Sequence, residues 1–234
     1  MAAFPDKFDE FQSALEANGL TFFGALEIDE SVCAKGMEKL IGQKAVLVGN
    51  AGPSMWNVFS KSNEFADGNA DPMNRWTRRV IDTLALEYGA KAVYPFDEPY
   101  WPFQRIATKA SGVNHSPLGV LVHPEYGLWY AFRGLIVLNE NQELTSRIKE
   151  LSHSFDTLIH PCDVCDDKPC LASCPVGAFS RKALNTKLCF EHLDSNLQPH
   201  CSQLGCLARG ACPVGNGYKY GADQIKFHMA AYRG

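Results

Sequence analysis

One stretch decides how this sequence is organised: Cys162-Asp-Val-Cys165-Asp-Asp-Lys-Pro-Cys170-Leu-Ala-Ser-Cys174-Pro175-Val-Gly177. Four more cysteines follow it, namely Cys189, Cys201, Cys206 and Cys212. The last of them is again followed by Pro-Val-Gly, and the ninth cysteine, Cys33, lies alone near the start. Eight grouped cysteines that end twice in Cys-Pro-Val-Gly indicate a separate module in the last third of the chain.

Three kinds of site compete for these eight cysteines. A disulfide framework needs an oxidising compartment, and the N-terminus lacks the basic segment and apolar core of a secretory signal. Structural zinc in two four-cysteine sites suits thiolate pairs at short spacing. In a pair of four-iron clusters, three closely spaced thiolates wrap one cluster while a fourth, followed by Pro, ligates the other. The repeated Cys-Pro favours two [4Fe–4S] clusters.

The same pattern predicts which cysteines share a cluster. One cluster takes Cys162, Cys165, Cys170 and, crossing over, Cys212. The other takes Cys189, Cys201, Cys206 and, crossing over, Cys174. Two centres within one small domain can exchange single electrons.

This module resembles a two-cluster bacterial ferredoxin and, in particular, the ferredoxin-like domain of epoxyqueuosine reductases and reductive dehalogenases. There too a lone cysteine, here Cys189, stands between two grouped sets. The spacing departs from the usual Cys-x2-Cys-x2-Cys-x3-Cys-Pro. Residues 166–169 widen one gap by two positions, and the last group is stretched to x4 and x5.

Apolar periodicity in the first 150 residues predicts an α+β domain. The expected helices cover residues 8–15, 72–88 and 101–110. The expected strands cover 20–26, 44–49, 91–94, 118–122 and 129–138. A polar, hairpin-like turn over 123–127 joins the last two strands.

Two further predictions concern the helix expected over residues 72–88. Asp71-Pro72 is a helix-start signal, with Asp71 as the N-cap. We expect Trp76, Leu84 and Leu86 to lie in the core.

Composition and charge exclude several classes of protein. The 234 residues are 46% hydrophobic, and 26 acidic against 22 basic residues give a formal net charge of −4. This balance provides no positive field for a phosphate backbone, which argues against nucleic acid as a partner. Apolar runs such as 135–138 are far shorter than the roughly 20 residues that cross a bilayer. We therefore expect a cytoplasmic protein with no membrane partner.

The chain lacks the motifs of the commonest nucleotide-binding and hydrolytic enzymes. It has no Gly-x-Gly-x-x-Gly, no Walker sequence and no Gly-x-Ser-x-Gly. No low-complexity linker separates its halves. We place the boundary after residue 150, which gives domains 1–150 and 151–234.

A second resemblance is carried by Ser116-Pro-Leu-Gly-Val-Leu-Val-His-Pro-Glu-Tyr-Gly-Leu-Trp-Tyr-Ala-Phe-Arg-Gly-Leu-Ile-Val-Leu138. It is similar to the core segment of cblC-type cobalamin-processing proteins, and residues 47–59 are similar to a strand-turn-helix of the same proteins. The resemblance covers about residues 44–140. It implies a nitroreductase-like corrinoid-binding domain, which here precedes the ferredoxin-like domain.

The two resemblances together imply an iron–sulfur oxidoreductase that binds a corrinoid. Reduction of cobalt(III) needs low-potential electrons, and a two-cluster module supplies them on the same chain. The implied activity is cobalamin reduction with removal of an upper ligand, or cobalamin-dependent reduction of a small-molecule substrate. The implied partners are the corrinoid, a small molecule or thiol, and an external electron donor of the flavodoxin or ferredoxin type.

Two other functions stay open. The chain can be a two-cluster electron carrier whose first domain docks a partner enzyme and binds no corrinoid. It can also be a tRNA-modifying enzyme like epoxyqueuosine reductase, although its acidic balance and short length count against this.

The second resemblance also implies the corrinoid-binding residues: Gly119, His123, Tyr126, Gly127, Trp129 and Arg133. The glycines would let the macrocycle approach the backbone, or else only form their turns. The aromatic rings offer flat apolar surfaces to the corrin, or else face the core. His123 would face the corrin or ligate cobalt, or else bond to the backbone of its own turn. Arg133 needs a partner, either a corrin amide, a carboxylate of a co-substrate, or an acid in a structural salt bridge.

Asp97 is the candidate catalytic residue. It lies roughly where epoxyqueuosine reductases place an acid that protonates the substrate. A carboxyl group buried beside an apolar macrocycle would have a raised pKa and act as a general acid.

Overall fold

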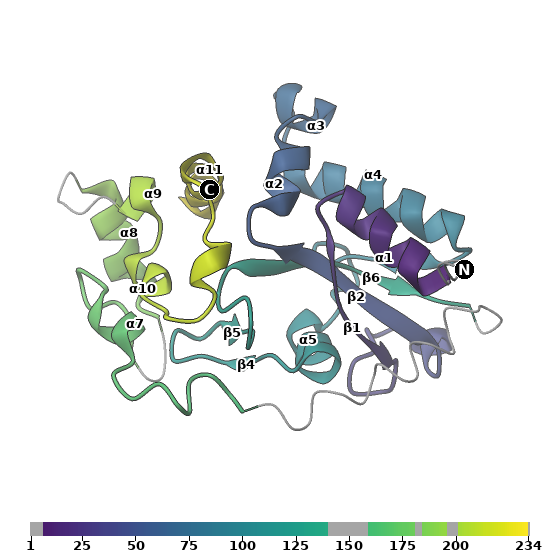
Figure 1. Cartoon of the computed structure of the whole chain (residues 1–234), viewed down its shortest axis with the longest axis horizontal. Helices are drawn as coiled ribbons and strands as arrows, with labels where there is room; N and C mark the ends of the chain where they lie inside the picture. Colours follow the sequence, from purple (N-terminus) through teal and green to yellow (C-terminus); the bar gives the residue numbers. More distant parts are fainter. Residues whose placement is uncertain (1–6, 140–158, 181–183, 196–200, 234) are drawn as a thin grey trace, which may run out of the picture. The chain divides into compact units, whose positions relative to one another are not determined.

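The structure is a computed structural model that describes residues 7–139, 159–180, 184–195 and 201–233. Within these ranges the chain forms two compact units, whose elements are labelled in Figure 1. The first unit contains the residues up to Gly112 and those from Ala131 to Asn139. The second contains Val113–Tyr130 and the described residues from Ile159 onward.

A four-stranded sheet forms the centre of the first unit, in the order β1-β2-β6-β3. The strands are β1 (Thr21–Glu27), β2 (Lys44–Ala51), β6 (Tyr130–Val137) and β3 (Lys91–Val93). β1 pairs antiparallel with β2, and β3 pairs antiparallel with β6. β2 is buried continuously from Ala45 to Asn50. Since successive side chains point to opposite faces, both faces of this sheet are covered.

Helices cover the two faces. Figure 1 shows α1 (Lys7–Ala17) and α4 (Pro72–Glu87) on one side of the sheet and α5 (Phe103–Ser111) on the other. α1 meets the end of α4 through the rings of Phe11 and Tyr88, whose centroids are 5.2 Å apart. The short elements are η1 (Glu38–Leu40), α2 (Ser54–Phe59) and α3 (Asn63–Ala66). The helices and strands predicted from periodicity are therefore present in this unit.

One prediction about α4 needs correction. The helix begins at Pro72 with Asp71 as its N-cap residue, as predicted, although the Asp71 side chain makes no capping hydrogen bond and its backbone is left-handed with φ of 51°. Trp76 and Leu84 are buried as predicted, whereas Leu86 is 79% exposed. Two residues along a helix correspond to a turn of roughly 200°, which carries Leu86 to the opposite side from Leu84.

The second unit consists of short elements. Its two-stranded sheet pairs β4 (Asn114–His115) antiparallel with β5 (Leu121–Val122). Its helices are α7 (Pro169–Ala172), α8 (Thr186–Asp194), α9 (Cys201–Leu204), α10 (Leu207–Gly210), η2 (Asn216–Tyr218) and α11 (Ala222–Arg233). α10 packs on α7, and α11 packs on α9. One buried apolar cluster of this unit consists of Leu118, Val122, Leu128 and Ala208, and several cysteines pack against it.

The predicted hairpin-like turn over residues 123–127 is present, but the strands on either side of it do not pair with each other. β5 pairs with β4, whereas β6 belongs to the sheet of the first unit. The turn between them is closed on itself, because His123 and Gly127 exchange backbone hydrogen bonds of 2.8 and 3.0 Å. Alternating apolar residues indicate which side of a strand is buried but not which strand is its partner.

The predicted domain boundary after residue 150 lies outside the described residues. Residues 113–130, which were assigned to the first domain, belong to the same compact unit as the cysteine module. In the described part of the chain, no helix has the length and apolar character needed to cross a membrane.

Candidate functional site

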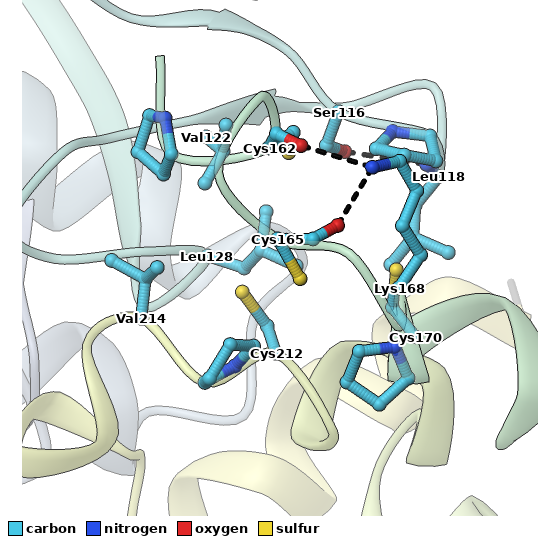
Figure 2. Close-up of a pocket in the computed structure, with 14 residues that line it drawn as sticks. Ser116, Leu118, Val122, Leu128, Cys162, Cys165, Lys168, Cys170, Cys212 and Val214 are labelled. Atoms are coloured by element: carbon cyan, nitrogen blue, oxygen red, sulfur yellow. Dashed lines mark hydrogen bonds between the residues drawn. The ribbon is translucent and has the colours of Figure 1, made fainter. Parts of the chain in front are cut away.

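Four cysteines line one hollow in the second unit, and we call them the first quartet: Cys162, Cys165, Cys170 and Cys212. The remaining walls of the hollow are mostly apolar side chains and prolines. Figure 2 shows the sulfurs of Cys165 and Cys212 pointing toward each other across it. Leu118, Val122 and Leu128 form the apolar side of the hollow.

Short local structures position the first quartet. Cys162 and Cys165 belong to one turn, in which the Cys165 amide donates to the Cys162 carbonyl at 3.4 Å. Cys170 is the second residue of α7. The Cys212 amide donates to the carbonyl of Arg209 at the end of α10, at 3.2 Å. Residues distant in sequence thus converge because α10 packs on α7.

The thiols of the first quartet raise one another's pKa values. Burial raises the pKa of Cys162 to about 11, and the thiols of the other three members contribute in the same direction. Burial likewise raises the pKa values of Cys170 and Cys212. Four thiolates in this hollow would therefore be unstable unless a positively charged group bound them.

The other four grouped cysteines form a second quartet: Cys174, Cys189, Cys201 and Cys206. Burial raises the pKa of Cys189, and the thiols of the other three raise it further. Cys201 has a raised pKa for the same reasons, with contributions from Cys206 and Cys174. The structure thus brings the cysteines together in the crossed grouping that the Cys-Pro pattern predicts. That they ligate metal stays a prediction.

Backbone amides point at sulfurs after each Cys-Pro. The Ala178 amide donates to Cys174 Sγ at 3.3 Å. The Val214 backbone hydrogen-bonds to the Cys212 thiol and lowers its pKa, although burial has the larger, opposite effect. Such bonds stabilise a charged sulfur.

Two observations concern the alternatives to iron–sulfur ligation, namely a disulfide framework and structural zinc. All nine cysteines lie within the described residues and none forms a disulfide. Across the described ranges, no three His, Cys, Asp or Glu side chains are gathered as ligands of one metal ion.

The turn over residues 123–127 lies directly against the loop that follows Cys212. A Cβ added to Gly127 would stand 2.1 Å from the Val214 carbonyl oxygen, and one added to Gly215 would stand 2.2 Å from the Tyr126 carbonyl oxygen. Both glycines have positive φ, of 57° and 76°. Two backbones therefore touch where side chains would keep them apart.

His123 is held inside its own turn. Its Nδ1 accepts hydrogen bonds from the amides of Glu125 and Tyr126, at 3.1 and 3.2 Å. Its ring stacks on Tyr126 with centroids 4.3 Å apart, and burial lowers its pKa to about 4. A neutral imidazole that accepts at Nδ1 carries its proton at Nε2. A histidine that binds a metal through Nε2 instead donates from Nδ1, so the turn-bonding alternative accounts for the observed geometry.

Trp129 and Gly119 have structural surroundings of their own. The Arg209 guanidinium lies over the rings of Trp129 and Tyr220, 4.5 and 4.8 Å from their centroids. Arg209 also donates from Nε and Nη2 to the Leu128 carbonyl at 2.9 and 2.6 Å. Gly119 has a φ of 78° and a Cβ there would meet no neighbouring atom within 4 Å. Gly119 therefore leaves room beside the backbone.

The two remaining predicted residues, Arg133 and Asp97, lie in the first unit. Arg133 Nε donates to the side-chain oxygen of Asn50, a fully buried residue, at 2.8 Å. An amide therefore provides one partner for this arginine. Asp97 forms an ion pair with Arg78 and is 38% exposed, in contrast to the buried carboxyl group that we expected.

Lys168 is a site residue that the sequence analysis missed. Its ammonium donates to the carbonyls of Cys162 and Cys165 at 3.0 and 2.7 Å (Figure 2). The widened gap over residues 166–169 was the signal that could have identified it, because the added residues include this lysine.

Comparisons with known proteins support the fold. No family model and no curated protein matches the sequence. Among solved structures, the chain is similar to the B12-trafficking protein CblC of C. elegans, a homologue of human MMACHC. The TM-score is 0.53 at 13% sequence identity, over 95% of this chain and 91% of that chain. The chain has a CblC-like fold.

This likeness extends well beyond residues 44–140, which carried the resemblance in sequence. It confirms the mixed α/β, cblC-type part of the predicted fold. The bacterial-ferredoxin-like character of the cysteine module stays a prediction.

Proposed function

We propose that this chain is an iron–sulfur oxidoreductase that binds a corrinoid, and that its two cysteine quartets hold two [4Fe–4S] clusters. The single observation that carries the proposal is the crossed grouping of eight thiols into two sets of four. When bound, a reduced cluster would give one electron to cobalt(III), and an external donor of the flavodoxin or ferredoxin type would reduce the cluster again.

The chemistry of the quartets fits this group. Buried thiols that raise one another's pKa values need a cationic partner to become thiolates. The four ligands of a four-iron cluster bind four different metal atoms and are spread around it, whereas zinc requires them to converge on one ion. Amide hydrogen bonds to Cys174 and Cys212 would stabilise the negative charge of a cluster.

The first quartet supports electron delivery toward the corrinoid-binding segment. Ser116, Leu118, Val122 and Leu128 lie in the stretch that resembles cblC-type proteins, and all four line the hollow of the first quartet. The turn over 123–127 touches the loop after Cys212. Short separation favours single-electron transfer, so a cluster held by the first quartet would be the last centre before cobalt.

Most of the remaining predicted residues keep their roles as proposals. Tyr126 would offer a ring surface to the corrin, and Gly119 would allow close approach of its edge. Trp129 is only 5% exposed and lies under the Arg209 guanidinium, so it would support the segment from within and not contact the corrin. Arg133 would bind a corrin amide or a carboxylate while Asn50 orients it. Asp97 would donate a proton to a reduced organic substrate, with Arg78 holding its carboxyl group in place. His123 would shape the turn through its Nδ1 bonds.

The CblC likeness supports the corrinoid as ligand. That protein is a B12-trafficking protein, and its fold covers nearly all of this chain. Cobalamin reduction with loss of an upper ligand is therefore the activity we favour over reduction of an organic substrate.

The decisive test is anaerobic purification with analysis of iron, sulfide and zinc, followed by addition of hydroxocobalamin and a reductant. We expect about eight irons per chain, as two four-iron clusters require, and a change of the visible spectrum to cobalt(II) or cobalt(I). Cys189→Ala should reduce the iron content to about half, whereas Cys33→Ser, outside both quartets, should not change it. Zinc in place of iron would overturn the cluster assignment.

The same experiment tests the second candidate, a two-cluster electron carrier. The eight grouped thiols favour it as much as they favour the first. Eight irons with an unchanged corrin spectrum would select the carrier. An Asp97→Asn variant that binds hydroxocobalamin and reduces cobalt normally, but fails to reduce an organic substrate, would support Asp97 as the acid.

A further inference from the structure

Lys168 lies in the segment that departs from the usual ferredoxin spacing. Residues 166–169 add two positions between Cys165 and Cys170, and Lys168 has a left-handed backbone with φ of 39°. Its side chain turns back over the loop, and its ammonium donates to the carbonyls of Cys162 and Cys165. Figure 2 shows this ammonium at the edge of the hollow that the first quartet lines.

The walls of the hollow make the positive charge of Lys168 important for any negative charge held by the first quartet. Leu118, Val122 and Leu128 form an apolar wall, which provides little solvation for negative charge. Reduction adds one negative charge to a cluster already surrounded by four thiolates. The Lys168 side chain is partly buried, and its bonds to the Cys162 and Cys165 carbonyls fix its positive charge beside two members of the quartet. It therefore favours the reduced state of anything that the quartet binds.

We propose that Lys168 raises the reduction potential of the cluster held by the first quartet and leaves that of the second quartet unchanged. This inference rests on the proposed function. Lys168 is a positioning and tuning residue, since its ammonium bonds to backbone carbonyls and not to the sulfurs. The potential so set determines how readily the last centre before cobalt accepts an electron.

The structure also provides a matched control. Lys187 precedes Cys189 by two residues, just as Lys168 precedes Cys170. Its side chain is 83% exposed and lies 3.9 Å from Glu191, its neighbour on α8. Solvent screens such an exposed charge, so its removal should alter neither potential.

The test is a redox titration of the anaerobically reconstituted chain with dithionite, followed by electron paramagnetic resonance, on the wild type and four variants. Lys168→Met should lower one of the two potentials by about 59 mV or more, which corresponds to a tenfold change in the equilibrium constant of a one-electron couple. Lys168→Arg, which keeps the charge, should retain the wild-type potential. Lys187→Met should leave both potentials unchanged.

Lys168→Gln separates tuning from a purely structural role, because glutamine keeps a hydrogen-bond donor and lacks the charge. We expect it to retain about eight irons and to show the same lowered potential as Lys168→Met. Two unchanged potentials in either variant would overturn the inference. Loss of the first cluster from both uncharged variants would also overturn it, since Lys168 would then only hold the loop. A wild type without about eight irons would instead refute the proposed function.

Discussion

Replacing Gly215 by alanine tests the contact between the turn over 123–127 and the loop that follows Cys212. A Cβ at this position would stand 2.2 Å from the Tyr126 carbonyl oxygen and 2.8 Å from the Gly127 amide nitrogen. Both neighbours are backbone atoms, so no side-chain rotation can relieve the overlap. Gly177 is the matched control, because it occupies the same place in the first Cys-Pro-Val-Gly, has a φ of 60°, and a Cβ there would meet nothing within 4 Å.

The expected magnitudes follow from two separate costs. Each alanine would adopt a left-handed backbone, which costs about 1–2 kcal/mol. Gly215→Ala adds overlap with the Tyr126 carbonyl, and forced contacts of this kind cost about 1–3 kcal/mol, here near the upper end. The difference between the two variants should therefore be about 2–3 kcal/mol. For a chain of this size it corresponds to a melting temperature lower by about 5–10 °C.

The assay is thermal unfolding of the anaerobically purified proteins, followed by circular dichroism at a single scan rate. A second measurement adds Gly127→Ala and the double variant. Because each substitution separates the same two backbones, the double variant should cost clearly less than the sum of the single variants. Melting temperatures of Gly215→Ala and Gly177→Ala that agree within about 1 °C would refute the packing argument.

Three further predictions concern other parts of the molecule. The pKa of His123 falls from 6.5 to about 4 through burial; the unfolded chain therefore binds the proton more readily, and the unfolding free energy should fall as the pH is lowered from about 6.5 to about 4. A nuclear magnetic resonance titration of the His123 ring that gives a midpoint near 6.5 would contradict this. Arg209→Met removes two hydrogen bonds to the Leu128 carbonyl and should lower the unfolding free energy by about 2 kcal/mol in urea denaturation. An unchanged unfolding free energy would show that this contact does not stabilise the fold. Tyr94→Phe removes the 2.7 Å hydrogen bond from the Tyr94 hydroxyl to Asp82 and should cost about 1 kcal/mol in the same assay. An unfolding free energy equal to that of the wild type, or higher, would contradict this prediction.

Local sequence determined the elements of the first unit. The continuous apolar run 44–49 and the periodic spacing around Trp76 depend only on neighbouring residues, and both became the elements that they predict. Asp71-Pro72 fixed where α4 begins, since proline cannot lie in a helix interior. The Cys-Pro repeat also predicted which cysteines lie together, because in the two-cluster pattern the cysteine before proline pairs with cysteines from a distant segment.

Other features depended on which segments meet in space, and local sequence does not contain that information. β5 pairs with β4 instead of β6, although the alternation of apolar residues is compatible with either partner. Gly127 was predicted to let a macrocycle approach the backbone, and only the folded chain shows that Gly127 and Gly215 each lie against the other's loop.

The candidate site depended on the tertiary structure in the same way. Asp97 was expected to be buried, and its pairing with Arg78 became visible only when α4 and the loop after β3 came together. Lys168 lies in a stretch that the sequence showed only as two added residues. The structure shows that its ammonium donates hydrogen bonds to two cysteine carbonyls. Sequence pattern thus determined which residues form helices, strands and thiol groups, while packing decided their partners, because burial and hydrogen bonding are satisfied between segments far apart in the chain.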